Sequence, residues 1–184
     1  MTPRALMGVR LSRAACLIPI LLACIGSDQL TKWLAARYLA PAGSLSFLCD
    51  TLRLSYVENS GGFLGLLGGL PENFRFLLLT CGVAGLVVPG LIGILWSTAL
   101  RLSTAILAIL VLGGGLSNLV DRLVNDGRVI DFLNIGLGGF RTGIFNLADV
   151  WILFGSFALG VVLIQRDAGE RAGQGRSSQS GSCR

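Results

Sequence analysis

The chain has 184 residues, of which 53% are hydrophobic and only 14% are charged, and its formal net charge is +5. A typical soluble domain has about 25% charged residues, so this composition excludes an ordinary soluble globular protein. The chain contains no histidine, which excludes catalytic triads and zinc sites that depend on imidazole. Because the fourteen arginines and one lysine are spread along the chain and form no single basic face, we expect no nucleic-acid binding.

Four apolar segments are long enough to cross a membrane as helices. They cover about 14–39, 74–96, 102–120 and 144–164. Each supplies the roughly 20 residues that a hydrocarbon core of about 30 Å requires. A soluble helical bundle would need a polar face on each helix, and most of the second segment has no charge on any face. The sequence therefore predicts an all-α integral membrane protein with four transmembrane helices, in which residues 14–164 form the membrane domain.

The distribution of arginine predicts the orientation in the membrane. Eight arginines lie in the N-terminal segment 1–13, at Arg101 and in the C-terminal segment 165–184, which together contain only two acidic residues. The positive-inside rule then places both termini in the cytoplasm and the loops 40–73 and 123–143 outside. The segment 165–184 is rich in Gly, Ser and Arg without periodicity, so we expect a disordered cytoplasmic tail.

The two outer loops contain candidate β-strands. Residues 52–57 alternate with a period of two, and 44–48 can form the partner strand of a hairpin. The glycine-rich apolar segment 61–70, which ends before Pro71, is expected to form a short helix on the membrane surface. The second loop has a further strand candidate at 128–133. Small β elements over a four-helix bundle are the expected architecture.

Polar residues of three predicted helices fall in one layer. With 1.5 Å per residue, they lie roughly 20 to 30 Å above the inner face. These residues are Asp28, Asn118, Asp121, Asn146 and Asp149. An ionisable group at this depth is costly unless it is paired or hydrated, so it indicates a functional site. For Asp28 alone we favour the simpler interpretation, in which it is neutralised by Lys32 four residues later on the same helix face.

Three aspartates are candidates for catalysis. An Asn-x-x-Asp pattern ends at Asp121 and again at Asp149, and Asp131 follows on the predicted strand. Arg122 can neutralise Asp121, which leaves Asp131 and Asp149 without an obvious cation. Two close carboxylates cannot both ionise and therefore share a proton, and such a dyad can deprotonate a water and protonate a leaving amine. Spacing alone does not decide whether Asp121 or Asp131 is the partner of Asp149.

Five motifs resemble, in order, those of the lipoprotein signal peptidase family, also called signal peptidase II. They are DQLTK at 28–32, YVENSGGF at 56–63, NLVDR at 118–122, VIDF at 129–132 and FNLAD at 145–149. The resemblance covers about residues 26–164. It implies a bacterial aspartic endopeptidase that removes signal peptides from prolipoproteins by cutting before the cysteine that carries a diacylglyceryl group. Ser117 departs from the glycine usual in the family at this position.

The resemblance also implies roles for individual residues. The dyad falls on Asp131 and Asp149, and Asn59 and Arg122 face the substrate backbone. Asp121 and Arg122 are expected to form an ion pair at the outer end of the third helix, while the β elements form a cradle over the site. The implied substrate-binding or supporting residues are Asn59, Gly61, Asp28, Lys32, Asn118, Asp121, Arg122 and Asn146.

The expected partners are diacylglyceryl-modified prolipoproteins and membrane lipid, with no metal ion or cofactor, and the expected form is a monomer. The resemblance places the protein in the bacterial cytoplasmic (inner) membrane, with the active site near the outer face. Gly61 and Gly62 could hinge the segment 63–70 over the site, or this segment could merely anchor the loop.

Parts of the sequence are also compatible with two other functions. The sequence LLAC at 21–24 could be a lipobox, which would make the protein a lipoprotein modified at Cys24, but the chain then enters the membrane three more times. A small proton-coupled transporter could use Asp28, Asp121 and Asp149. Its acids, however, all lie near one membrane face, and the sequence shows no convincing internal repeat.

Overall fold

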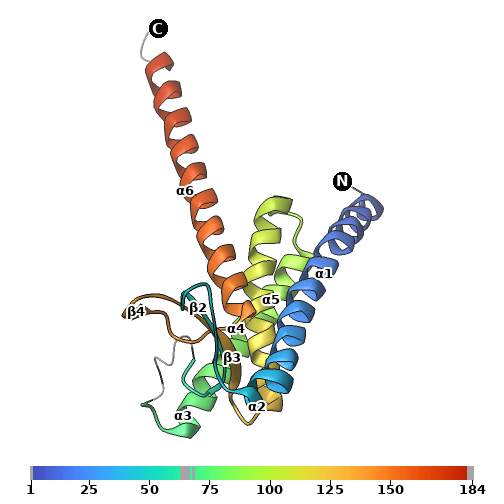
Figure 1. Cartoon of the computed structure of the whole chain (residues 1–184). Coiled ribbons are helices and arrows are strands. Elements are labelled where there is room, and N and C mark those ends of the chain that lie inside the picture. Colours follow the sequence, from blue (N-terminus) through green and yellow to red (C-terminus); the bar gives the residue numbers. More distant parts are fainter. Residues whose placement is uncertain (1, 63–66, 68, 182–184) are drawn as a thin grey trace.

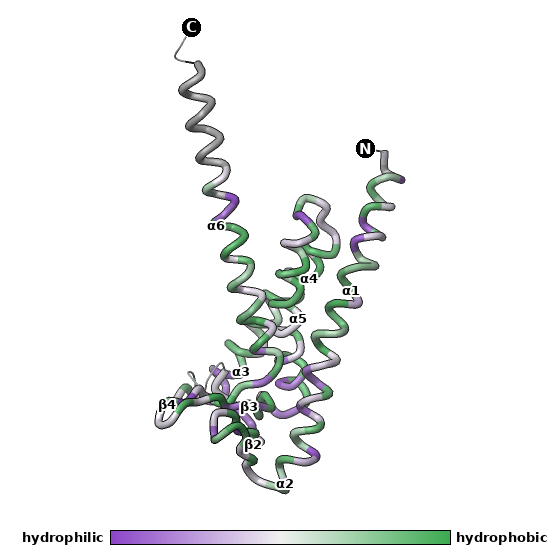
Figure 2. The backbone as a smooth tube through the Cα atoms, turned by 45° about the horizontal axis from the view of Figure 1, so that its top comes forward, coloured by the Kyte–Doolittle hydropathy of each residue, from purple (hydrophilic) through white to green (hydrophobic). Residues whose placement is uncertain are grey.

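The computed structural model describes residues 2–62, 67 and 69–181. Four helical stretches in this part of the chain are long and apolar enough to cross a membrane, which confirms the predicted number of spans (Figure 1). They cover Arg4–Ala42, Glu72–Trp96, Leu102–Val124 and Leu147–Arg166. Figure 2 shows that most of their length is hydrophobic and that hydrophilic residues gather where the helices meet the sheet. The protein is therefore a multi-pass membrane protein.

The first span begins earlier than predicted. Helix α1 (Pro3–Leu34) starts within the segment 1–13, because the side chain of Thr2 accepts a hydrogen bond from the Ala5 N–H and a proline occupies the first turn. The span continues through the π-helical segment η1 (Ala35–Leu39) into α2 (Ala40–Ala42). Pro41 in α2 has no N–H to donate, which favours a change in the hydrogen-bond pattern just before it.

The second span consists of α3 (Glu72–Phe76), η3 (Leu77–Gly82) and α4 (Val83–Trp96). The third span is the centre of the bundle. Helix α5 (Leu102–Val124) packs against α1, α4 and α6. The buried apolar core between α1, α4 and α5 is formed by Leu17, Val87, Leu91, Ala105 and Ile109.

Helix α6 (Leu147–Gly181) differs from the prediction at both ends. It begins after Asn146, because Phe145 still forms a β-bridge with Leu133. Its helical backbone continues to Gly181, whereas the sequence predicted a disordered tail after Gln165. The residues that follow include Gln, Arg, Glu and Ala, which favour helix, and these outweigh the glycines that suggested disorder. In Figure 1 this part of α6 projects away from the other helices.

Helices α5 and α6 approach each other closely at two glycines. A Cβ atom at Gly114 would lie 2.5 Å from the carbonyl oxygen of Ala148. A Cβ atom at Gly155 would lie 2.9 Å from the carbonyl oxygen of Leu107. Small residues allow such contact between the backbones of membrane helices. The first contact fixes the position of the first turn of α6.

The outer-loop strands form one antiparallel sheet in the order β1-β2-β3-β4. Its strands are β1 (Leu45–Phe47), β2 (Leu52–Asn59), β3 (Val129–Leu137) and β4 (Phe140–Arg141). The predicted hairpin is confirmed, with Leu45 opposite Leu54, and so is the strand predicted at 128–133. The sequence did not predict that β2 pairs with β3, which joins the two loops into one sheet.

Half of the helix predicted at 61–70 lies outside the described residues, since these exclude 63–66 and 68. The described residues of this segment form bends and turns. Both a surface helix and a hinged lid in this segment stay predictions.

Candidate active site

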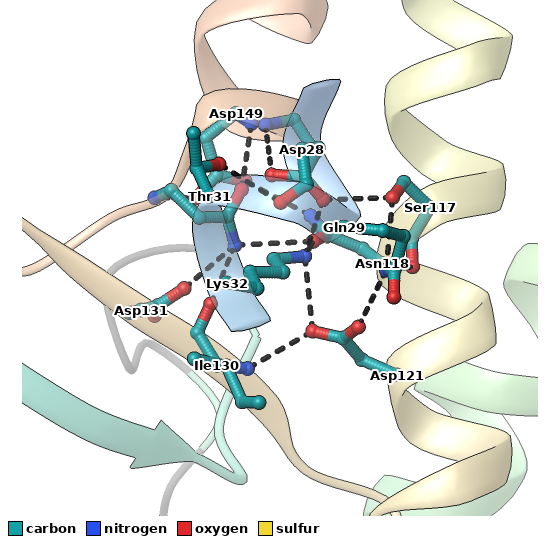
Figure 3. Close-up of polar contacts among 12 residues, drawn as sticks. Asp28, Gln29, Thr31, Lys32, Ser117, Asn118, Asp121, Ile130, Asp131 and Asp149 are labelled. Atoms are coloured by element: carbon teal, nitrogen blue, oxygen red, sulfur yellow. Dashed lines mark hydrogen bonds and ion pairs between the residues drawn. The ribbon is translucent and has the colours of Figure 1, made fainter. Parts of the chain in front are cut away.

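Polar side chains from α1, α5, α6 and β3 meet where the helices adjoin the sheet, which we call the sheet end of the bundle (Figure 3). Each of them is at most 9% exposed. They are Asp28, Lys32, Ser117, Asn118, Asp121, Arg122, Asp131, Asn146 and Asp149. The residues predicted to share one layer are therefore brought together in a single buried cluster.

Lys32 lies at the centre of this cluster and bonds to two carboxylates. Its Nζ is 2.6 Å from Asp28 Oδ2 and 2.9 Å from Asp121 Oδ2, and it donates a 2.8 Å hydrogen bond to Asn118 Oδ1. The predicted pair of Asp28 and Lys32 is present, but it belongs to a larger network that links α1 to α5. One buried cation thus compensates two buried acids.

The predicted ion pair between Asp121 and Arg122 is wrong, because Asp121 pairs with Lys32. Adjacent residues of a helix point in different directions, so they do not face each other. The carboxylate of Asp121 also accepts hydrogen bonds from Gln29 Nε2 at 2.7 Å and from the Ile130 N–H at 3.0 Å. Arg122 donates from Nη1 to the carbonyl oxygen of Asn118, whereas its buried Nε has no hydrogen-bond partner among the described residues.

The first turn of α6 is fixed by two carboxylates. Asn146 Oδ1 accepts a hydrogen bond from the Asp149 N–H at 3.0 Å, and the Asn146 N–H donates to Asp149 Oδ2 at 3.2 Å. This reciprocal arrangement is a capping box. Asp28 Oδ1 accepts from the Ala148 N–H at 2.8 Å, and Ser117 Oγ donates to Asp28 Oδ2 at 2.7 Å. Asp149 is therefore held by its own helix start and indirectly by α1 and α5.

Two asparagines connect Asp131 with Asp149. Asn146 Nδ2 donates to Asp131 Oδ1 at 2.7 Å and to Asn118 Oδ1 at 3.1 Å. Asn118 Nδ2 in turn donates to Asp149 Oδ1 at 3.1 Å. The other oxygen of Asp131 accepts a 2.8 Å hydrogen bond from Asn59 Nδ2. The carboxylates of β3 and α6 thus belong to one hydrogen-bonded cluster, although they come from different parts of the fold.

Burial raises the pKa of Asp131 to about 6, and the negative charge of Asp149 adds to this rise. Hydrogen bonds from Asn59 and Asn146 and the charge of Lys32 oppose it. A carboxyl group with this pKa is partly protonated near neutral pH. The pair can therefore present a neutral acid beside a second carboxylate.

Asn59 and Gly61 form the turn at the end of β2. The Gly61 N–H donates to Asn59 Oδ1 at 2.8 Å, and Asn59 Nδ2 donates to the carbonyl oxygen of Gly62 at 2.8 Å. Gly62 has a φ of +76°, which glycine adopts without strain. In the sheet, Asn59 lies opposite Val129, two residues from Asp131, so the turn places the amide beside this carboxylate.

Sequence reasoning did not assign two polar residues to the site. Gln29 Nε2 donates to Ser117 Oγ at 3.1 Å as well as to Asp121, and Ser117 is fully buried. The available signal was their position beside Asp28 and Asn118 in otherwise apolar helices. Within the described ranges, no group of three or more Cys, Asp or Glu side chains is arranged so that it could hold a metal ion.

Comparisons with known proteins agree on one family. The sequence model of signal peptidase (SPase) II matches residues 20–165. The lipoprotein signal peptidase of Caldanaerobacter subterraneus subsp. tengcongensis is 34% identical over 137 residues, which cover 74% of this chain and 88% of the relative. That of Syntrophus aciditrophicus is 36% identical over 142 residues, covering 76% and 86%.

A solved structure has a similar fold. It is a bacterial membrane enzyme determined by the in meso method at 2.3 Å resolution, and it superposes with a TM-score of 0.71 at 22% sequence identity. The superposition covers 85% of this chain and 91% of the other. At this identity the likeness concerns the fold alone.

Proposed function

The chain belongs to the signal peptidase II family, whose activity is the removal of signal peptides from prolipoproteins, and we propose that Asp131 and Asp149 catalyse this cleavage. The substrates are diacylglyceryl-modified prolipoproteins, and the bond that is cut precedes the lipid-modified cysteine. This assignment makes the protein an aspartic endopeptidase.

The state of the four buried aspartates carries the proposal. Asp28 and Asp121 are both bonded to Lys32. Among the described residues, neither Asp131 nor Asp149 has an ion-pair partner, and two asparagines hold them in one cluster. A carboxylate that is already neutralised is a poor base, so this arrangement favours Asp131 over Asp121 as the partner of Asp149. It also argues against a transporter that uses Asp28 and Asp121 as proton sites.

The reaction follows from a dyad that shares one proton. The ionised carboxylate takes a proton from a water molecule while the water oxygen bonds to the carbonyl carbon of the scissile peptide. The neutral carboxyl group gives its proton to the reacting peptide, the C–N bond breaks, and the leaving amine carries that proton away. Because the two groups titrate together, the shared proton belongs to the pair and not to one residue.

Arg122 and Asn59 are proposed to bind the substrate backbone. The buried Nε of Arg122 has no hydrogen-bond partner among the described residues, so a peptide carbonyl could satisfy it. Asn59 already contacts Asp131 and stands at the turn that ends β2. Lys32 and Asp28 then act as supporting residues that hold the asparagines and the first turn of α6 in place.

We further propose that the protein is a monomer in the bacterial inner membrane with both termini in the cytoplasm. Both ends of the described chain lie away from the sheet in Figure 1, at the end of the bundle that carries the arginine-rich segments. The positive-inside rule favours a cytoplasmic location for that end, which places the sheet and the site toward the outer face.

Purified Asp131→Asn and Asp149→Asn variants test the dyad in a gel assay with a diacylglyceryl-modified prolipoprotein. Each substitution keeps the side-chain volume and removes the titrating group, so cleavage should fall by about a thousandfold or more. Asp126→Asn is the matched control, because Asp126 is exposed in a turn with a φ of +51° that asparagine tolerates. Near-normal turnover in a folded Asp131→Asn or Asp149→Asn variant would refute the aspartic mechanism.

A further inference from the structure

The sheet carries an exposed apolar surface that the proposed catalysis does not use. We call it the apolar sheet face and define it by Leu45, Phe47, Ile135, Leu137 and Phe140. Phe140 is 90% exposed and Leu137 is 79% exposed, and the other three are between 40% and 46% exposed. Large contiguous apolar patches are rare on surfaces that face water and usually mark an interaction site.

Strand register places these side chains on one face of the sheet. Phe47 lies opposite Leu52, which lies opposite Ile135 on the next strand. Leu137 is two residues beyond Ile135 and lies opposite Phe140. Residues directly opposite in an antiparallel pair share a face, as do residues two apart on one strand. The apolar residues of all four strands, with Leu52 of β2 between β1 and β3, therefore form one continuous surface.

The other face of the sheet is polar, and its polar side chains bond to one another. Ser46 lies opposite Arg53, which lies opposite Asn134. Arg141 Nε donates to Asn134 Oδ1 at 2.6 Å, and Arg53 forms a 2.6 Å ion pair with Asp50 in the turn between β1 and β2. The sheet is thus amphipathic, with apolar residues on one side and bonded polar residues on the other.

The position of the sheet relative to the helices indicates what covers the apolar side. In Figure 1 the β4 end of the sheet projects sideways from the bundle and lies level with the beginning of α6. Helix α6 is a membrane span whose side chains Leu153, Phe154 and Phe157 are more than half exposed, and in a membrane such side chains contact lipid. An apolar sheet face at this level would continue the lipid-contacting surface of α6 beyond the helices.

We propose that the apolar sheet face lies in the lipid of the bilayer at the sheet end of the bundle. Acyl chains cover Phe47, Leu137 and Phe140, while the polar face with Arg53 and Arg141 is turned to water. The sheet that carries Asp131 is then held at a fixed depth by lipid as well as by the helices. This inference does not depend on the proposed function, and its test requires no activity.

Two adjacent residues of β1 provide a matched test, because Phe47 and Ser46 point to opposite faces. Phe47→Cys and Ser46→Cys are made separately in a background whose native cysteines are replaced by alanine, and each is labelled with a nitroxide. The protein is placed singly in nanodiscs of phosphatidylethanolamine and phosphatidylglycerol. Power-saturation EPR then compares the accessibility of each label to oxygen, which partitions into lipid, and to a water-soluble nickel chelate.

The expected result is an oxygen-to-nickel ratio several-fold higher at position 47 than at position 46. Phe140→Cys serves as a second variant on the same face if Phe47→Cys fails to fold, as judged by circular dichroism. Equal, water-like ratios at both positions would overturn the proposal. Protection of position 47 from the nickel chelate only when several copies share a vesicle, together with dipolar broadening between labels, would indicate a second copy and would also overturn the proposal. Protection only when a prolipoprotein is added would overturn it as well.

Discussion

Gly114→Ala should damage the proposed site by displacing the first turn of α6. Gly114 is in α5, and a Cβ atom there would lie 2.5 Å from the carbonyl oxygen of Ala148 and 2.8 Å from Cγ1 of Ile152. Ala148 immediately precedes Asp149, and its N–H is bonded to Asp28. A single added methyl group therefore acts on the turn that positions one of the two candidate catalytic carboxylates.

The size of the displacement follows from this contact. Ordinary contacts of a Cβ atom begin at 3.4 Å, so a contact at 2.5 Å requires the two helices to separate locally by about 0.9 Å. Overpacking of this kind costs about 1 to 3 kcal/mol of stability. A misplacement of about 1 Å in a catalytic constellation can cost roughly a hundredfold in rate. The loss of activity should therefore exceed what the loss of folded protein explains.

The assay combines thermal unfolding in detergent with kcat for a lipid-modified prolipoprotein, measured well below the unfolding transition. Gly160→Ala is the control, since it also adds a methyl group to a glycine in a membrane span but meets nothing within 4 Å. Its stability should be unchanged or higher, by up to about 1 kcal/mol, because alanine favours helix. If Gly114→Ala kept normal kcat and stability, the close approach of α5 and α6 would not position Asp149.

Three further predictions concern the polar cluster. Burial raises the pKa of Asp131 from its ordinary value of 3.8 to about 6, so the folded state holds this proton more tightly than the unfolded state. Stability should then fall as pH rises from about 4 to about 6, by up to about 3 kcal/mol, and Asp131→Asn should flatten this dependence in thermal unfolding measured across that range. Lys32→Met leaves two buried carboxylates without their cation and should cost about 3 to 5 kcal/mol, and an unchanged unfolding temperature would contradict the ion pairs. Ser117→Ala removes a hydrogen bond to the buried carboxylate of Asp28 and should cost about 1 to 3 kcal/mol, whereas the exposed Ser103→Ala should change little in the same measurement.

Local patterns predicted the parts of the fold that depend on neighbouring residues. The length of the apolar segments predicted the four spans, and the alternation at 52–57 predicted the hairpin. The pairing of β2 with β3 could not be predicted, because it joins segments about 75 residues apart and depends on how the helices bring the two loops together. The helix beyond Gln165 was missed because glycine and serine content outweighed the helix formers in the prediction.

In the candidate site, too, features local to one helix could be predicted, whereas contacts between elements could not. Depth along each helix predicted which polar residues share a layer, because the helical rise is constant. The rotation of each helix about its axis was not available from the sequence. For this reason Asp121 was paired with its neighbour Arg122, whereas the structure turns it toward Lys32 on α1. Ser117 and Gln29 were missed for the same reason, since their contacts depend on which faces of α1 and α5 meet.

Asp131 and Asp149 lie on different elements of the fold, so heating can separate them before the helices unfold. One carboxylate belongs to the sheet and the other to the start of α6, and the asparagine side chains of Asn118 and Asn146 connect them. A small outward movement of the sheet would part the two acids while every helix kept its backbone hydrogen bonds. Such a partial opening needs less free energy than global unfolding. Inactivation by heat should therefore precede the loss of helical circular dichroism, and it should be reversible on cooling as long as the bundle stays intact.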